Sequence, residues 1–288
     1  MVKSVILNSS NYVTNSGNIF RLNFNTQLNA PEEFDAVAIQ NLSIYNSTNN
    51  ITSNYGNNTI TLIFLGTSYT FTFPDGYYSA SDMNAFLQSQ MVANGLYVID
   101  SSSNYGYFVE IVVNSVRYAI SLNLYPIPTS ATASSLGYSQ PSSATWSFPS
   151  STQTPQVTIN SAFGSLIGQY AGTYPSSVSS STVNYVSVIT PIISPVNSYI
   201  LTCNLVDNKL NNPNNLFFSV PISVGFGELI INTPPQLIWN DIRQGKYDYL
   251  EIRLYDQLLN TLNIQDYELT ILLALRTPQD KLNFASTK

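Results

Sequence analysis

The side chains of this chain that could carry out acid–base chemistry are almost all carboxylates. Its 288 residues include 16 Asp and Glu, 10 Lys and Arg, and no histidine. Without histidine a Ser-His-Asp triad is impossible, and the commonest general base and transition-metal ligand are both absent. Two carboxylates about 5–10 Å apart in a cleft could still hydrolyse a glycoside, but no pair is singled out by its spacing. We therefore assign no catalytic residue and predict that the chain is not an enzyme.

The densest acidic cluster is formed by Glu32, Glu33 and Asp35. A calcium site there would need further oxygen ligands and a tight loop. Because the cluster directly precedes the apolar run 36–39, a solvated turn is the favoured interpretation. A glycine loop that could hold a phosphate is also absent, so the sequence predicts neither a metal site nor a cofactor.

Cys203 is the single cysteine, which excludes an intrachain disulfide and a zinc site of several cysteines. It lies on the apolar face of an expected strand and should be an inert, buried thiol. The 20 tyrosines could form a stacking platform for sugars or bases, but ordinary strand and interface positions are the favoured interpretation. Trp146 and Trp239 could be interface anchors or ordinary packing residues, and both interpretations stay open.

Charge is scarce and unevenly distributed along the chain. Only 9% of the residues are charged, against about 25% in an average soluble protein. The net charge of −6 and the scattered cations argue against nucleic-acid binding. The 89 consecutive residues 118–206 carry no charge at all. They could form a surface solvated by Ser, Thr and Asn, or a surface that faces other protein, since interface cores are depleted of charge.

No segment of the sequence predicts a membrane span or a signal peptide. None reaches the roughly 18 continuous apolar residues of a spanning helix. The first ten residues lack the apolar core of a signal peptide. We therefore expect a soluble chain that is made in a cytosol.

Apolar and polar residues alternate along many segments, which is typical of half-buried strands. The apolar members of these segments are Phe20, Leu22 and Phe24; Ile60, Leu62 and Phe64; Val109, Ile111 and Val113; Tyr199, Leu201 and Cys203; Leu250, Ile252 and Leu254; and Leu269, Ile271, Leu273 and Leu275. Most of these segments are rich in β-branched or aromatic residues. The sequence therefore predicts an all-β fold.

One helix is predicted over residues 79–95. Ser79 and Asp82 can cap its first turn. Its apolar residues recur at helical spacing, and Gly95 can adopt the left-handed conformation that ends a helix. The apolar face consists of Met83, Phe86, Leu87 and Met91.

The expected architecture is a single jelly roll that covers residues 1–288. About eight strands, one short helix and long loops fit an eight-stranded sandwich of two sheets. No repeat and no domain linker is recognisable. The Ser/Pro-rich stretch 126–155 is predicted to be a long, variable loop or a small insertion.

Several segments together resemble capsid proteins of virophages and Polinton-type viruses, most closely the penton proteins of mavirus-like viruses. The resemblance extends from about residue 5 to residue 276, and the order and spacing of the segments carry it. The stretch 126–155 does not contribute. The resembling segments are 74–88 (PDGYYSASDMNAFLQ), 94–97 (NGLY), 167–175 (IGQYAGTYP), 199–206 (YILTCNLV), 255–257 (YDQ) and 263–275 (NIQDYELTILLAL).

The resemblance implies a structural capsid protein with a jelly-roll fold. Such a subunit forms homopentamers at the five-fold vertices of an icosahedral virion that is assembled in the host cytoplasm. It contacts a double-jelly-roll major capsid protein and has neither catalytic residues nor a cofactor. We further hypothesise that loops from residues 118–206 contribute to the intersubunit or outward-facing surface.

Two alternatives remain from other functional classes. A receptor- or glycan-binding β-sandwich, such as a fibre head, predicts a shallow groove lined by Tyr or Trp, and thermal stabilisation by its ligand. A glycosidase predicts two close carboxylates in a cleft.

Overall fold

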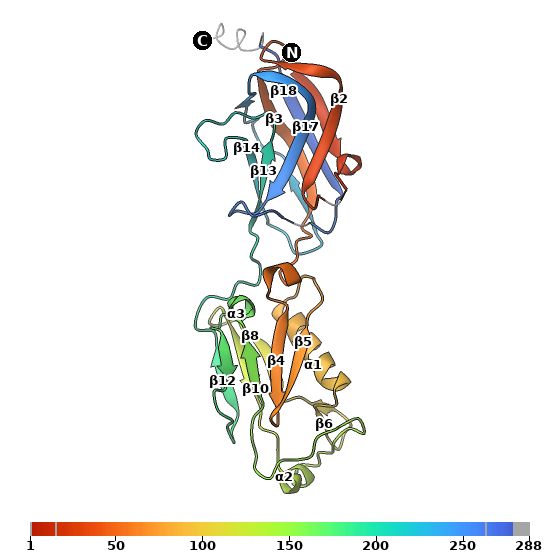
Figure 1. The fold of residues 1–288 in the computed structure, drawn as a ribbon, viewed down its shortest axis with the longest axis vertical. Coiled ribbons are helices and arrows are strands. Elements are labelled where there is room, and N and C mark those ends of the chain that lie inside the picture. Colours follow the sequence, from red (N-terminus) through yellow and green to blue (C-terminus); the bar gives the residue numbers. More distant parts are fainter. Residues whose placement is uncertain (1, 15, 263, 279–288) are drawn as a thin grey trace. The chain divides into compact units, whose positions relative to one another are not determined.

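The computed structural model describes residues 2–14, 16–262 and 264–278. The chain folds into two compact units, which are described separately below (Figure 1). Unit 1 comprises residues 1–49 and 196–288, and unit 2 comprises residues 50–195. This division differs from the single domain expected over residues 1–288. Unit 2 is an insertion into unit 1, and it is much larger than the 126–155 stretch.

Unit 1 is built from two antiparallel sheets. The first has the order β1-β18-β3-β15, with the short β16 also pairing with β3, and the second has the order β14-β13-β17-β2. The strands of unit 1 are β1 (Val2–Asn8), β2 (Ile19–Ala30), β3 (Ala36–Tyr45), β13 (Ser198–Cys203), β14 (Leu216–Pro221), β15 (Leu229–Asn232), β16 (Asn240–Asp241), β17 (Gly245–Tyr255) and β18 (Leu269–Arg276), and a 3-10 helix spans Ser9–Asn11.

The strand order of unit 1 is that of a jelly roll. If its strands other than β16 are counted along the chain, one sheet has the order first–eighth–third–sixth and the other fifth–fourth–seventh–second. Two four-stranded sheets connected in this way form the eight-stranded double Greek key. The predicted fold class, an all-β jelly-roll sandwich, is therefore confirmed for unit 1. Unit 2 is inserted between the third strand, β3, and the fourth, β13.

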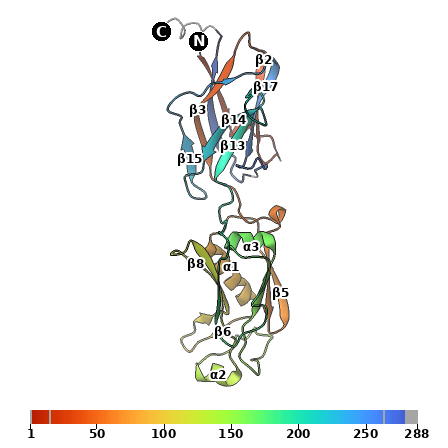
Figure 2. The ribbon, with the colours of Figure 1, turned by 90° about the vertical axis from the view of Figure 1, so that its left-hand side faces the viewer.

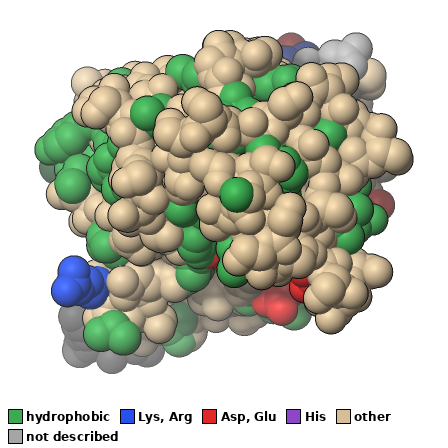
Figure 3. Space-filling model, turned by 90° about the horizontal axis from the view of Figure 1, so that it is seen from below, with side chains coloured by type: hydrophobic (Ala, Val, Ile, Leu, Met, Phe, Trp, Pro, Cys, Tyr) green, Lys and Arg blue, Asp and Glu red, His purple; other side chains and the backbone are tan. Residues whose placement is uncertain are grey.

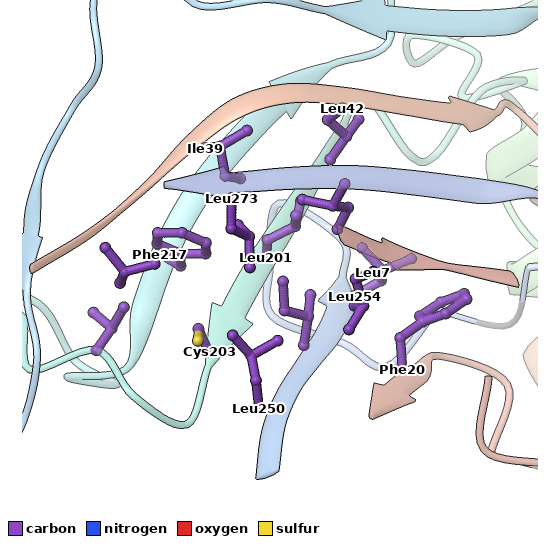
Figure 4. Close-up of a cluster of buried hydrophobic side chains, with 14 of the residues drawn as sticks. Leu7, Phe20, Ile39, Leu42, Leu201, Cys203, Phe217, Leu250, Leu254 and Leu273 are labelled. Carbon is purple, nitrogen blue, oxygen red and sulfur yellow. The ribbon is translucent and has the colours of Figure 1, made fainter. Parts of the chain in front are cut away.

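The core of unit 1 lies between the two sheets (Figure 4). Successive side chains of a strand point to opposite faces, so alternate residues enter the core. Tyr199, Leu201 and Cys203 of β13 are completely buried, as the alternation predicted. Leu250 and Leu254 of β17 are also fully buried and belong to the same cluster.

Unit 2 is a second β-rich unit, and it contains the helices α1 to α3. One of its sheets has the order β11-β10-β4-β5, another has the order β12-β9-β8, and β6 pairs with β7. Its elements are β4 (Thr59–Phe64), β5 (Thr67–Thr72), α1 (Ala80–Ala93), β6 (Val98–Ile99), β7 (Tyr105–Gly106), β8 (Val109–Asn114), β9 (Ala119–Leu124), α2 (Ser130–Ser135), β10 (Gln156–Ile159), α3 (Ser161–Ile167), β11 (Gly172–Tyr174) and β12 (Val183–Val186), with a 3-10 helix at Ser53–Tyr55.

Helix α1 confirms the predicted helix and belongs to the core of unit 2. The Ser79 hydroxyl accepts a hydrogen bond from the Asp82 backbone N–H, and the Asp82 carboxylate accepts one from the Ser79 N–H, which forms a capping box. Gly95, at φ +68°, follows the C-terminal end. The helix buries Met83, Leu87 and Met91 and lies between β8 and β5 in Figure 2.

The stretch 126–155 is more structured than the predicted loop. It contains α2, and its Ile127 is completely buried. Trp146 donates a hydrogen bond from Nε1 to the Gly95 carbonyl at 2.7 Å, which ties the stretch to the end of α1. Periodicity missed the six-residue α2 and the seven-residue α3 because such short helices show only two turns. None of the helices in the described part of the chain has the length and apolarity required to cross a membrane.

We predict that unit 1 folds after residues 50–195 are replaced by a Gly/Ser linker of about six residues. Its core cluster contains only residues of unit 1, and the Tyr199 hydroxyl lies 3.4 Å from Asn46 Oδ1, so the two ends that the linker must join are close. Urea unfolding followed by circular dichroism should show one cooperative transition. Adding Leu201→Ala should lower the free energy of unfolding by about 2–5 kcal/mol. A broad, non-cooperative transition would show that unit 1 needs unit 2 to fold.

Candidate functional site

The four carboxylates of unit 2 each hold a turn, a loop or a helix start. Asp75 accepts hydrogen bonds from the backbone and the hydroxyl of Ser53, and Asp82 caps α1. Asp100 closes a loop by accepting from the backbone of residues 102 and 104. Glu110 accepts hydrogen bonds from the Tyr125 hydroxyl at 2.8 Å and from the Asn123 amide at 3.2 Å. These side chains are therefore engaged locally and do not converge on a cleft.

Hydrogen bonds lower the pKa of two of these carboxylates. The pKa of Asp82 is lowered by its bonds with the side chain and then the backbone of Ser79. The pKa of Asp100 is lowered chiefly by its bond with the Asn104 side chain. Both groups are thus stabilised as carboxylates, which suits a capping role and not that of a general acid.

The structure separates the acidic cluster expected at residues 32–35. Glu32 and Glu33 are exposed in a turn, as predicted. Asp35 is buried and accepts a hydrogen bond from Arg276 Nε at 3.0 Å. Within the ranges that the structure describes, no three acidic, histidine or cysteine side chains are placed to hold a metal ion.

Cys203 and the two tryptophans have packing roles. Burial raises the pKa of the Cys203 thiol to about 12, which agrees with the predicted inert thiol. Trp146 packs edge-on against Phe64, with ring centroids 5.1 Å apart. The Arg276 guanidinium lies 5.1 Å from the Trp239 ring centroid. For Trp146 and Trp239, the structure thus favours ordinary packing over interface anchoring.

A charged cluster lies on the outward face of β2 and β17 in unit 1. Glu251 is 6% exposed and accepts hydrogen bonds from Arg21 Nε at 2.9 Å and from Arg253 Nε at 2.7 Å. Burial raises the pKa of Glu251, but the two arginines outweigh this and hold it below its ordinary value. Arg21 also lies over the Tyr249 ring at 4.6 Å. The carboxylate is fully paired, so the cluster stabilises the sheet.

Unit 2 carries very little charge. Of its 146 residues only Asp75, Asp82, Asp100, Glu110 and Arg117 are charged. The face in Figure 3 is correspondingly dominated by uncharged side chains and backbone, with few charged groups. The charge-free stretch 118–206 covers the second half of this unit.

Exposed apolar side chains gather at the tip of the β8–β9 hairpin. Val113 is 57% exposed, Val116 94% and Tyr118 80%. Alternation placed Val113 on the buried face with Val109 and Ile111, which are indeed buried. Val113 is nevertheless exposed at the end of β8 next to the hairpin turn, although Ile120, its partner on β9, is buried.

A hollow of about 590 Å³ lies beside this tip. Its walls are the hairpin end, residues 113–115 and 118–120, and the segment 191–194, in which Ile192 is 49% exposed. No charged side chain lines it. We define the hairpin tip and the segment 188–194 as the apolar tip surface. The hairpin tip also carries the exposed Arg117, so this surface is apolar apart from one cation and suits contact with a largely uncharged protein surface.

The comparisons with known proteins give similarity in structure only. No protein-family model matches the chain, and no curated protein matches its sequence. The chain is similar in structure to a mavirus penton protein, with 8% sequence identity, a TM-score of 0.42, and coverage of 96% of this chain and 98% of that chain. It is also similar to a chain of the Sputnik virophage structure, with 12% identity, a TM-score of 0.40, and coverage of 97% and 99%.

We predict that Glu251→Gln lowers the free energy of unfolding of unit 1 by about 1 kcal/mol at pH 7, because it removes the charge that pairs with the two arginines. The effect is small because solvent screens Arg21 and Arg253, whose side chains are 40% and 46% exposed. The folded-state pKa of Glu251 lies below the ordinary 4.5, so its contribution is present above that pH and is lost as the pH falls through the folded-state value. Urea unfolding should therefore show a smaller difference between the proteins at about pH 3 than at pH 7.

The matched control is Asp248→Asn, which removes an exposed carboxylate of the same strand that bonds Gln27. It should change the free energy of unfolding by less than Glu251→Gln does. An equal effect of Glu251→Gln at both pH values would contradict the stated role of the carboxylate.

Proposed function

We propose that the chain is a structural capsid protein that forms homopentamers at the five-fold vertices of an icosahedral virion, assembled in the host cytoplasm. The observation that carries the proposal is the sparsely charged surface of unit 2, with exposed apolar side chains at the apolar tip surface. In the assembly, this surface contacts other copies of the chain, and the pentamer contacts a double-jelly-roll major capsid protein.

The low charge of unit 2 supports a surface that is covered by protein. A free domain normally keeps many charged residues for solubility, about a quarter of its surface or more. Unit 2 has five charged residues among 146. Interface cores are depleted of charge and enriched in aromatic residues, and the exposed side chain of Tyr118 fits that composition.

The jelly roll of unit 1 supports a structural role. Two-sheet sandwiches of this topology recur in viral capsid subunits. The segments that resemble penton proteins fall in both units, with 74–88 in unit 2 and 263–275 in unit 1. The fold alone does not determine function, so the proposal depends on the surface chemistry together with the fold.

Pentamer formation requires a heterologous contact. In a five-membered ring each copy presents one patch to its neighbour and receives a different patch, and the rotation closes the ring. The apolar tip surface would supply one of these patches. The carboxylates of unit 2 are engaged in local hydrogen bonds at turns and helix starts, and none of them lines the hollow beside the hairpin tip.

We predict that Tyr118→Asp and Ile192→Asp each weaken self-association of the chain by about tenfold or more, because each buries an unpaired charge in the contact. Sedimentation velocity over a range of concentrations measures the association. Both residues are exposed, so the melting temperature of the dissociated chain should not change.

Leu210→Asp is the control, since Leu210 is 97% exposed and lies in unit 1. This control variant should have an association constant within about twofold of that of the unmodified chain. The interface assignment is wrong if all three substitutions weaken association equally. It is also wrong if Tyr118→Asp and Ile192→Asp lower the melting temperature of the dissociated chain, because the loss of association would then follow from a loss of folding.

A further inference from the structure

Five tyrosines gather around the short β6–β7 hairpin of unit 2. Tyr97 and Tyr105 lie at the hairpin, with ring centroids 4.6 Å apart. Tyr107 follows β7, while Tyr125 follows β9 and Tyr138 follows α2. Figures 1 and 2 both show β6 and α2 at the same end of unit 2. The proposed capsid function does not use this cluster.

Backbone hydrogen bonds hold the three segments together. The Tyr125 N–H donates to the Phe108 carbonyl at 2.9 Å. Ile99 of β6 and Ser139 exchange two backbone hydrogen bonds, both of 2.8 Å. The positions of Tyr107, Tyr125 and Tyr138 are therefore fixed relative to one another by the fold of unit 2.

The segments enclose an open hollow of about 280 Å³. Three tyrosines, one phenylalanine and two prolines contribute to its walls. The lining residues are Val98, Gly106, Tyr107, Phe108, Tyr125, Pro126, Pro128, Leu136 and Tyr138. The hollow thus combines flat rings with phenol hydroxyls in a space of the size of a small ligand.

Of the three tyrosine hydroxyls in the hollow, one makes a hydrogen bond within the chain and two do not. The Tyr125 hydroxyl donates to Glu110. The hydroxyls of Tyr107 and Tyr138 make no hydrogen bond with any residue that the structure describes. Each can donate one hydrogen bond to a ligand and accept others. Burial raises the pKa of Tyr107 above its ordinary value; like an ordinary tyrosine, it is protonated near neutral pH and able to donate.

We propose that this hollow binds a neutral hexopyranose, one face of which packs on the tyrosine rings while its hydroxyls bond Tyr107 and Tyr138. A pyranose ring presents a flat C–H face, which suits an aromatic wall, and hydroxyls that both donate and accept. No Lys, Arg, Asp or Glu lines the hollow, so nothing there would pair with a charged sugar.

Other small ligands fit the hollow less well. An anionic sugar would be repelled by Glu110 behind Tyr125, in a unit whose only cation is Arg117. A quaternary ammonium ion could lie over tyrosine rings, but it has no donor or acceptor for the hydroxyls of Tyr107 and Tyr138.

Saturation-transfer NMR on the full chain tests the proposal, with the methyl glycosides of glucose, galactose and N-acetylglucosamine as probes. We expect at least one to bind with a dissociation constant of about 1–10 mM, the range of a weak contact made by few groups. Tyr107→Phe and Tyr138→Phe keep the rings and remove the open hydroxyls, and each should weaken binding about threefold to tenfold.

Tyr170→Phe is the matched control, since Tyr170 is exposed elsewhere in unit 2; it should leave binding unchanged. Tyr107→Ala should abolish the saturation transfer, and near-ultraviolet circular dichroism checks that this variant folds. The proposal is overturned if none of the three glycosides binds at about 50 mM, or if the control weakens binding as much as Tyr107→Phe does.

Discussion

Unit 1 depends on pairing between strands that lie at opposite ends of the chain. Residues 2–8 of β1 pair with residues 270–276 of β18, and β2 pairs with β17. These pairs form only when both ends are present, because the first sheet alternates early and late strands and β2 of the second sheet pairs with the late β17. The hydrophobic core between the sheets holds the pairs together. A 146-residue unit can therefore be inserted between β3 and β13 without interrupting either sheet.

The scarcity of charge links the fold to the proposed assembly. In unit 1, buried charge is balanced inside the unit by the pairs of Glu251 with two arginines and of Asp35 with Arg276. Unit 2 has almost no charge to balance, and its polar surface consists of hydroxyls and amides. Such a surface can be covered by another protein at a small desolvation cost, because few ions have to leave water.

Alternation predicted the strands well because the two faces of each sheet differ in burial. Each of the six predicted segments falls within an observed strand, including 199–203 and 269–275. Capping residues likewise predicted α1. The division into two units was missed because the connection at 46–50 does not resemble a linker: Asn46 and Asn50 are buried. Asn50 donates to the Tyr78 and Ile193 carbonyls, and a single sequence does not indicate such distant partners.

The candidate surfaces were partly visible in the sequence. The charge-free stretch pointed to unit 2, and the drop in charge after residue 50 is a signal that could have marked its boundary. Alternation alone does not show which apolar residues stay exposed, since Val113 is exposed although Ile120, its partner on β9, is buried. The grouping of five tyrosines depends on pairings such as Ile99 with Ser139, which lie 40 residues apart.

The central claim is that this chain assembles with itself into a closed ring of five. Light scattering on the purified chain over a range of concentrations measures its mass in solution most directly. A closed ring of five copies predicts a species of five times the 31.8 kDa chain mass. A stable trimer at every concentration would contradict it and favour a fibre-head type of assembly.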